Sequence, residues 1–412
     1  MEFNFLGAAR EVGKSAVFVE AGGKRVLLDY GVKLFGGGIT YPAGVKKLDA
    51  AIISHAHLDH SGSLPAIYDK HEVPWFGTFP TQALSDILIH DSVKVQKGQV
   101  PFALASIKRA GKNFVPLQYK VPYHFDKGFE ITLHDAGHIP GAAMVELNAE
   151  GKRILYTGDY KLGDTRMHEA AKTVKDVDYL ITESTYSERE HPDRRKAEEQ
   201  LYKRVMQAVD AGGTALLPCF AVGRSQEIMR VIRAFDKHVP IFFDGMAKAA
   251  TEVIMDYPSY YRKPDELSEA AESIEWVYSA KQRGKAVAGG GVIISTAGML
   301  TGGPVLWYIR NINAESTITL TGYGVQETNA WYLLNKQMVI IDGREIPIRN
   351  SVEYIDFSAH ASGSELIKFV EKANPQKVFC IHGDHCPEFA AKLKERGFDA
   401  YAPELDEKFV CD

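Results

Sequence analysis

Short apolar runs typical of buried strands alternate with helical patterns along the whole chain. The predicted strands are residues 25–29, 50–54, 153–157, 179–182, 214–217, 241–243, 291–295, 318–320 and 378–381. The predicted helices are residues 196–211, 225–235, 364–372 and 387–396, and Gly212 and Gly213 are expected to end the first of them. This alternation predicts an α/β fold.

Histidines and carboxylates lie at the carboxyl ends of several of these runs. The positions at the end of a run, or just past it, are Asp29, His55, Asp159, Glu183 and His382. Functional groups of α/β folds collect at the carboxyl ends of strands. We therefore expect these side chains to form one shared site.

The chain also predicts one domain inserted within another. Residues 187–195 are charged, contain a proline and lack apolar side chains, a composition typical of a domain boundary. From there to about residue 350 the histidines are isolated, and the motifs resume after Asn350. The expected domains are residues 1–188, 189–350 and 351–412, with the middle one inserted.

The composition is that of a soluble globular protein, with 45% hydrophobic and 25% charged residues over 412 positions. No apolar stretch is long enough to span a membrane, and the N-terminus lacks the pattern of a signal peptide. The four cysteines form no CxxC pair, so we expect free thiols in a reducing, cytoplasmic setting and no membrane contact. The net charge of −5 means that the chain is not a basic nucleic-acid-binding domain as a whole. A basic groove or a bound metal can still hold phosphates.

The segment of residues 55–60, with the sequence HAHLDH, is the densest group of metal-binding side chains. In an extended backbone His55 and His57 point the same way, because side chains alternate along a strand. Asp59 and His60 follow after the chain turns and can face a second ion. Imidazole and carboxylate groups suit Zn²⁺. A polar surface loop would explain one histidine more readily than three within six residues.

Further motifs complete a family resemblance. His138 lies between glycines that allow close backbone approach, and Asp159 follows a predicted strand. With Asp29 and residues 55–60, these positions resemble the successive motifs of the metallo-β-lactamase superfamily. The three additional motifs of the β-CASP nucleases, a group that includes ribonuclease J and the endonuclease subunit of the eukaryotic pre-mRNA 3′-end cleavage factor, are similar to residues 182–185, 356–361 and 381–384.

The resemblance covers essentially the whole chain, with some departures. Residues 220–227 and 298–304 also look like β-CASP segments, whereas residues 322–328 differ from the usual run and Asp384 stands where many relatives carry Glu. The extra RNA-binding domains of some relatives are not recognised. The resemblance implies a four-layer αβ/βα metallo-β-lactamase sandwich with an inserted α/β β-CASP domain, and a site in the cleft between them.

The resemblance also implies a set of ligands for two Zn²⁺ per chain. His55, His57 and His138 would bind one ion, and Asp59, His60 and His382 the second, with Asp159 between them. Two ions lower the pKa of a water, orient its attack and neutralise a phosphate.

Other residues have implied roles around the metals. Asp29 would hold the N–H of a ligand histidine, although a strand-end turn residue is the alternative. His360 would donate a proton to the departing 3′-oxygen or hold the scissile phosphate, and Glu183 would orient it and raise its pKa. Ser358 would donate to phosphate. Arg224 and Lys248 would contact the RNA backbone, with ordinary ion pairs as the alternative.

The stretch from Lys94 to Lys120 contains six basic residues and no acidic one. It also contains Phe102, Phe114 and Tyr119. Basic groups and aromatic platforms together suit single-stranded nucleic acid, and an ordinary solvated face is the equal alternative.

These observations favour a zinc-dependent ribonuclease that hydrolyses single-stranded RNA internally, from the 5′ end, or both, alone, as a homodimer or in an RNA-processing complex. A hydrolase of small esters or thioesters is one alternative, but it would not need the inserted domain. A catalytically silent subunit is another, and filled ligand positions argue against it. DNA as the substrate stays open.

Overall fold

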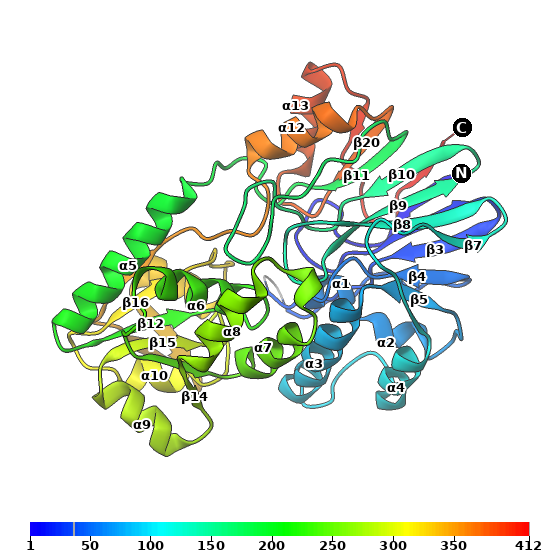
Figure 1. Cartoon of the computed structure of the whole chain (residues 1–412). Coiled ribbons are helices and arrows are strands. Elements are labelled where there is room, and N and C mark those ends of the chain that lie inside the picture. Colours follow the sequence, from blue (N-terminus) through cyan, green and yellow to red (C-terminus); the bar gives the residue numbers. More distant parts are fainter. Residues whose placement is uncertain (36–37, 412) are drawn as a thin grey trace.

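The structure, a computed structural model, describes residues 1–35 and 38–411. Over these residues the chain forms three large sheets and a two-stranded hairpin (Figure 1). The first sheet has the order β22 (Lys408–Val410), β1 (Glu2–Phe5), β2 (Val17–Ala21), β3 (Lys24–Leu28), β4 (Ala50–Ile52), β5 (Trp75–Gly77) and β6 (Phe114–Pro116). The second has the order β21 (Ala400–Tyr401), β20 (Lys377–Ile381), β11 (Tyr179–Glu183), β10 (Lys152–Tyr156), β9 (Ala143–Ala149), β8 (Phe129–Asp135) and β7 (Tyr123–Asp126).

These two sheets pack face to face around one apolar core. Along β9, Val145 and Leu147 point into the core that the sheets share, whereas Met144 points to the opposite face. β10 repeats this pattern, with Ile154 inside and Leu155 outside. The alternation follows from the two-residue period of a strand and leaves an apolar outer face that helices must cover.

Helices cover both outer faces. α2 (Leu64–Ile67) and α4 (Leu104–Lys112) pack on the first sheet, next to α1 (Leu58–Ser61) and α3 (Phe79–Val95). α12 (Gly363–Ala373) and α13 (Cys386–Glu395) pack on the second sheet. The result is a four-layer αβ/βα arrangement, which we call the four-layer part. The predicted fold class is confirmed.

The third sheet is parallel and belongs to the segment between β11 and α12. Its order is β14 (Glu275–Val277), β13 (Ile241–Asp244), β15 (Gly291–Ser295), β12 (Thr214–Pro218), β16 (Thr317–Leu320) and β19 (Ser351–Tyr354). One face is covered by α5 (Arg194–Asp210), α6 (Arg224–Phe235), α7 (Ala247–Met255) and α8 (Pro264–Glu272). The other is covered by α9 (Ala280–Ala288), α10 (Val305–Asn311) and α11 (Asn329–Lys336). The hairpin of β17 (Met338–Ile341) and β18 (Arg344–Pro347) and the 3₁₀ turn η1 (Pro258–Tyr260) complete this inserted part.

Each strand and helix expected from the sequence overlaps an observed element. The boundaries of the three expected domains stay a prediction. β19 pairs with β16 at residues 351–354, just past the expected end of the insertion at residue 350. We therefore propose that the insertion ends with β19. Within the described residues, no helix has the length and apolar character needed to cross a membrane.

Candidate metal centre

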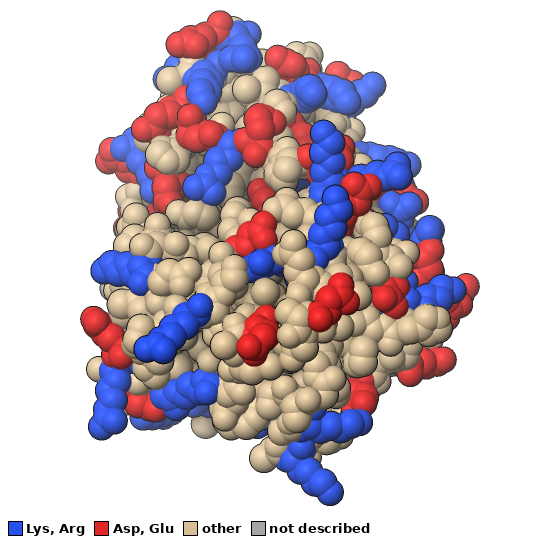
Figure 2. Space-filling view, turned by 90° about the vertical axis from the view of Figure 1, so that its left-hand side faces the viewer, with Lys and Arg blue, Asp and Glu red and all other residues tan. Residues whose placement is uncertain are grey.

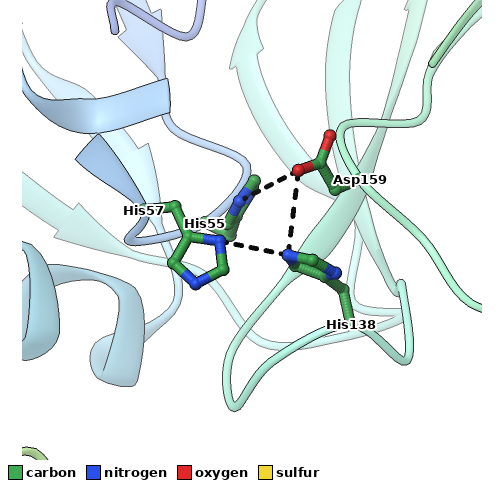
Figure 3. Close-up of side chains that lie close together, drawn as sticks. All are labelled: His55, His57, His138 and Asp159. Carbon is green, nitrogen blue, oxygen red and sulfur yellow. Dashed lines mark hydrogen bonds and ion pairs between the residues drawn. The ribbon is translucent and has the colours of Figure 1, made fainter. Parts of the chain in front are cut away.

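The first group of ligand-type side chains consists of His55, His57, His138 and Asp159 (Figure 3). One ligand atom from each lies within 4.8 Å of every other. His55 follows β4, His57 precedes α1, His138 lies in the loop between β8 and β9, and Asp159 follows β10. The carboxyl ends of β4 and β10 thus bring together side chains that are far apart in the sequence.

Two buried polar atoms of this group lack an ordinary hydrogen-bond partner within the described part of the chain. Among the described residues, His55 Nε2 and Asp159 Oδ1 are buried without a hydrogen-bond partner. The Nδ1 of His138 donates to the carbonyl of Ala359 at 2.8 Å, and its Nε2 lies 3.1 Å from His57 Nδ1. Buried unpaired polar atoms are costly unless something else satisfies them. A cation bound by neutral imidazoles would do so, and the donor set fits zinc.

The second group consists of Asp59, His60 and His382, again with ligand atoms within 4.8 Å of one another. His382 Nε2 lies 3.3 Å from Asp59 Oδ2. His382 follows β20 and has a φ of 52°, in the left-handed region that residues other than glycine seldom adopt. Strained backbone of this kind is concentrated at functional sites.

Asp159 lies between the two groups. Its Oδ2 is 3.6 Å from His55 Nε2 and 3.3 Å from His60 Nε2. Its Oδ1 is 3.4 Å from His382 Nδ1. One carboxylate therefore contacts both groups of side chains.

The pKa values of the histidines shift in different directions across the site. Burial, together with the neighbouring histidines, holds the pKa values of His55 and His138 well below the usual range. For Asp159, burial favours the neutral acid, but the surrounding histidines outweigh burial and hold its pKa well below the usual range. The carboxylates of Asp159, Asp59 and Asp29 overcome burial and raise the pKa of His60. Cation binding by His60 would therefore release a proton.

Asp29 holds His60 in place. Its Oδ2 accepts from His60 Nδ1 and from the Tyr156 hydroxyl, both at 2.7 Å. It also accepts from the backbone N–H and hydroxyl of Ser54, at 2.6 and 2.7 Å. Because Nδ1 of His60 donates to Asp29, Nε2 is the atom that faces Asp59 and Asp159 and that a cation would take on release of its proton.

His360 and Glu183 form the third side of the centre, again with Asp159. His360 Nδ1 donates to Glu183 Oε2 at 2.9 Å, while the other oxygen of Glu183 accepts from the Tyr160 N–H at 2.8 Å. Burial lowers the pKa of His360, but Glu183 and Asp159 outweigh burial and raise it to about 9. The Ser358 hydroxyl accepts from the His360 N–H at 3.1 Å.

Two residues near His360 were not singled out as site residues from the sequence. Lys161 is buried, and its Nζ donates to the His360 carbonyl at 2.9 Å. His191 was expected to be isolated, but its Nδ1 lies 2.9 Å from Asp356 Oδ2, in the loop that carries His360. The position of Lys161, two residues after Asp159, was the available signal.

Arg224 and Lys248 are both held by contacts within the inserted part. The guanidinium of Arg224 donates to the Thr321 carbonyl, and burial lowers its pKa. Lys248 Nζ is 3.2 Å from Asp244 Oδ1 and also donates to the Val277 carbonyl. For Lys248 the structure shows the ordinary ion pair that was the alternative. Contact of either residue with RNA stays a prediction.

In the basic stretch from Lys94 to Lys120 the lysines and the aromatic residues differ in exposure to solvent. Its lysines are exposed, namely Lys94, Lys97, Lys108, Lys112 and Lys120. Phe102 is buried in a small core with Ile89 and Ile107, so it cannot serve as an exposed stacking platform. Tyr119 is half-buried and lines a cleft between the two parts of the molecule.

Comparisons with known proteins agree with this geometry. The metallo-beta-lactamase superfamily domain matches residues 18–184, the Beta-Casp domain matches residues 225–333, and the Zn-dependent metallo-hydrolase RNA specificity domain matches residues 345–403. The probable RNase MJ4 of Methanocaldococcus jannaschii is 37% identical over 99% of each chain. The protein named RNase aCSPSF2 of Saccharolobus solfataricus is 31% identical over 97% of this chain and 83% of its own length.

A solved structure agrees in fold. The crystal structure of a protein of unknown function from Enterococcus faecalis V583 covers 100% of this chain and 99% of its own, with a TM-score of 0.61 and 14% identity. At that identity the likeness shows the fold alone. Together with the two RNase relatives, it places the chain in a known architecture. The chain belongs to the β-CASP family of the metallo-β-lactamase superfamily.

Proposed function

We propose that the chain is a zinc-dependent ribonuclease that hydrolyses phosphodiester bonds of single-stranded RNA in RNA processing or decay. The observation that carries this proposal is the position of Asp159 between two ligand groups, with His360 on the third side. A pair of ions next to a proton donor suits the hydrolysis of an anionic diester. Two relatives that cover nearly the whole chain have names that describe them as RNases.

The centre would hold two Zn²⁺. His55, His57 and His138 would hold one ion, the second group would hold the other, and Asp159 would contact both. The buried and unpaired atoms His55 Nε2 and Asp159 Oδ1 support this assignment. When bound, the ions supply an activated water and positive charge for the phosphate.

The remaining side chains hold the reacting groups in position and supply a proton to the leaving group. Protonated His360, held by Glu183 at 2.9 Å, donates a proton to the departing 3′-oxygen as the bond between that oxygen and phosphorus breaks. The products are a 5′-phosphate and a 3′-hydroxyl. Asp29 fixes the tautomer of His60. The Ser358 hydroxyl, which accepts from the His360 N–H, donates its own proton to a phosphate oxygen.

The charge distribution favours binding at the centre over binding across the outer surface. The chain has a net charge of −5. On the face of the inserted part in Figure 2, Lys and Arg are interspersed with Asp and Glu and form no single basic patch. The two ions carry +4, and Asp59, Asp159 and a hydroxide carry −3, so a residual positive charge would remain where the phosphate binds.

The setting and assembly are further parts of the proposal. The four cysteines are buried, and Cys219, Cys380 and Cys386 are free thiols, which suits a reducing cytoplasm. A homodimer or a larger RNA-processing complex is tested by light scattering of the purified chain with and without RNA.

The test of the proposed function uses purified chain with its zinc content measured, incubated with 5′-labelled single-stranded RNA beside His360→Ala. Internal fragments or a released 5′ mononucleotide, lost in His360→Ala while zinc stays near two per chain, support the proposal and show the mode of cleavage. Intact RNA with both ions bound contradicts it and favours a silent subunit. A small thioester and a single-stranded DNA, run in parallel, test whether the chain hydrolyses small esters or DNA instead of RNA.

A further inference from the structure

A cleft of about 430 Å³ lies between the four-layer part and the inserted part. Its lining comes from both, with Phe79, Gln118 and Tyr119 on one side and residues 256–260 on the other. Phe79 is the first residue of α3, which contacts α7 across the junction (Figure 1). The cleft is therefore formed where the two parts meet.

The walls of this cleft are aromatic and partly open to solvent. Phe79 is 42% exposed, which is unusual for a phenylalanine. Its ring is within 10° of parallel to that of Tyr257, with the ring centroids 6.3 Å apart. The rings of Tyr119 and Tyr260 meet edge to face, with centroids 5.2 Å apart. Because Phe79 is partly open to solvent, part of its ring is available to a third flat ring.

The cleft shares a wall with the metal centre. The Tyr119 hydroxyl donates to the Ala142 carbonyl at 2.8 Å, and the Thr81 hydroxyl of α3 donates to the Gly141 carbonyl at 3.0 Å. Both carbonyls belong to the loop that carries His138. The lining of the cleft is therefore hydrogen-bonded to the loop that supplies one of the candidate metal ligands.

The charges around the cleft suit a nucleic-acid strand. Lys120 is exposed and follows Tyr119 directly. The other exposed lysines of the basic stretch lie earlier in the chain. Lys94 is in the last turn of α3, Lys97 follows that helix, and Lys108 and Lys112 lie on α4. One acidic residue, Asp256, is in the lining. A flat apolar wall beside one ammonium group, that of Lys120, matches a base and a phosphate.

We infer that this cleft binds a nucleobase of the single-stranded RNA, stacked on Phe79 and Tyr257, on the same strand whose phosphodiester bond is hydrolysed. The inference rests on the proposed function and adds a binding site to it. Stacking of this kind tolerates any base, because every base has a flat π-face. The chain would therefore hold its substrate at two points, a phosphate at the metals and a base in the cleft.

The experiment measures the binding of fluorescently labelled single-stranded RNA by anisotropy, with all variants made on a His360→Ala background and with the RNA checked for integrity. Phe79→Ala and Tyr257→Ala are each expected to raise Kd about tenfold, because one base–aromatic stack is worth about that much. Phe79→Tyr keeps the stacking face and is expected to bind normally.

Phe235→Ala is the matched control. Phe235 is 38% exposed and stacks on Tyr202, with centroids 5.2 Å apart and an interplanar angle of 15°. It ends α6, outside the lining of the cleft. Its loss tests the effect of removing an exposed, stacked phenylalanine as such and is expected to leave Kd unchanged.

A scan of abasic positions along the RNA identifies the base that is bound. One abasic position is expected to weaken binding to the His360→Ala chain about tenfold and to have no added effect in the Phe79→Ala variant. Unchanged Kd in Phe79→Ala and Tyr257→Ala, with folding confirmed by thermal melting, overturns the inference. So does equal sensitivity of both chains to every abasic position, a result that would leave the cleft to a protein partner.

Failure of this inference is distinguishable from failure of the proposed function. If the chain with His360 cleaves RNA and the cleft variants bind like their parent, only the inference fails. If the chain neither binds nor cleaves single-stranded RNA, both fail.

Discussion

The ammonium group of Lys161 donates to the backbone carbonyl of His360 at 2.9 Å, in the buried region behind the metal centre. Lys161 also lies 3.5 Å from Glu365, the residue that completes the N-terminal cap of α12. This side chain therefore connects the loop of His360 to the helix that follows it.

Removing this donor is expected to lower kcat without loss of zinc. Lys161→Met leaves the His360 carbonyl without its partner and the loop less well positioned, so we expect a loss of about tenfold, since a misplaced proton donor loses part of its contribution. Lys161→Gln keeps an N–H donor and is expected to lose less. Steady-state kinetics with zinc analysis check this, and equal losses in both variants would argue against the positioning role.

His360→Ala is expected to discriminate between leaving groups. RNA releases a basic 3′-oxygen that needs a proton, so its hydrolysis should fall by about 10²- to 10⁴-fold. Bis(p-nitrophenyl) phosphate releases p-nitrophenolate, which departs without protonation, so its hydrolysis should change little. Equal losses for the two substrates would indicate that His360 holds the phosphate and does not donate the proton.

Asp29→Asn is expected to weaken metal binding by the second group. Asp29 lies 2.7 Å from His60 Nδ1, and its loss as a carboxylate leaves the tautomer and orientation of His60 less well held. Outer contacts of this kind are typically worth about 10- to 100-fold in metal affinity. Competition with a chromophoric chelator measures the affinities of the two groups for zinc. Only the affinity of the second group is expected to fall. Identical titrations for the two proteins would contradict the role given to Asp29.

Gly141→Ala is expected to disturb the loop of His138, whereas Gly128→Ala is not. Both glycines have positive φ, 86° and 76°, so both variants carry similar backbone strain. At Gly141 a Cβ would lie 2.6 Å from Thr78 Oγ1, whereas at Gly128 nothing lies within 4 Å. We expect loss of zinc only in Gly141→Ala, measured by metal analysis. Loss of zinc in both variants would attribute the effect to strain alone.

The stability of the fold is expected to depend on pH through Glu146. Its carboxylate is 2.8 Å from His134 Nε2 and 2.9 Å from Arg153 Nε. Burial favours the neutral form, but these partners outweigh burial and lower the pKa of Glu146 to about 2. A lowered pKa stabilises the fold above the unfolded value near pH 4.5, and that stability is lost as the pH falls toward 2.

Glu146→Gln tests this dependence. The variant is expected to lower the free energy of unfolding by roughly 1–3 kcal/mol at pH 7 and by progressively less as the pH falls below 4.5. Urea denaturation of both proteins at several pH values measures the difference. A difference that does not change with pH would contradict the electrostatic origin.

Much of the candidate centre was predictable because its residues lie in short motifs at the ends of apolar strands. His55, Asp159 and His382 each follow a strand whose side chains are buried, and the parallel pairing of β10, β11 and β20 brings the last two together. A local pattern of this kind is visible in one sequence. The ligand assignments themselves came from the family resemblance and await metal analysis of the variants.

Contacts between distant loops were not predictable in the same way. Nothing local in the sequence pairs Lys161 with His360, or His191 with Asp356, because these contacts depend on how the inserted part packs. Phe102 looked like a stacking platform beside basic residues, but it turns inward onto Ile107. Phe79, at the start of a helix, carried no signal until Tyr257 was placed opposite it.

The loop of residues 355–362 has a consequence for control of the reaction. It begins after β19, the edge strand of the inserted part, and ends at α12, which packs on the four-layer part. His360 therefore lies on a segment that joins the two parts, while the five candidate ligand histidines all lie in the four-layer part. His360 itself is fastened to the four-layer part, because its ring donates to Glu183 and its carbonyl accepts from Lys161. A movement of the inserted part would therefore have to be absorbed in residues 355–359 to leave the proton donor at its place beside the ligand histidines.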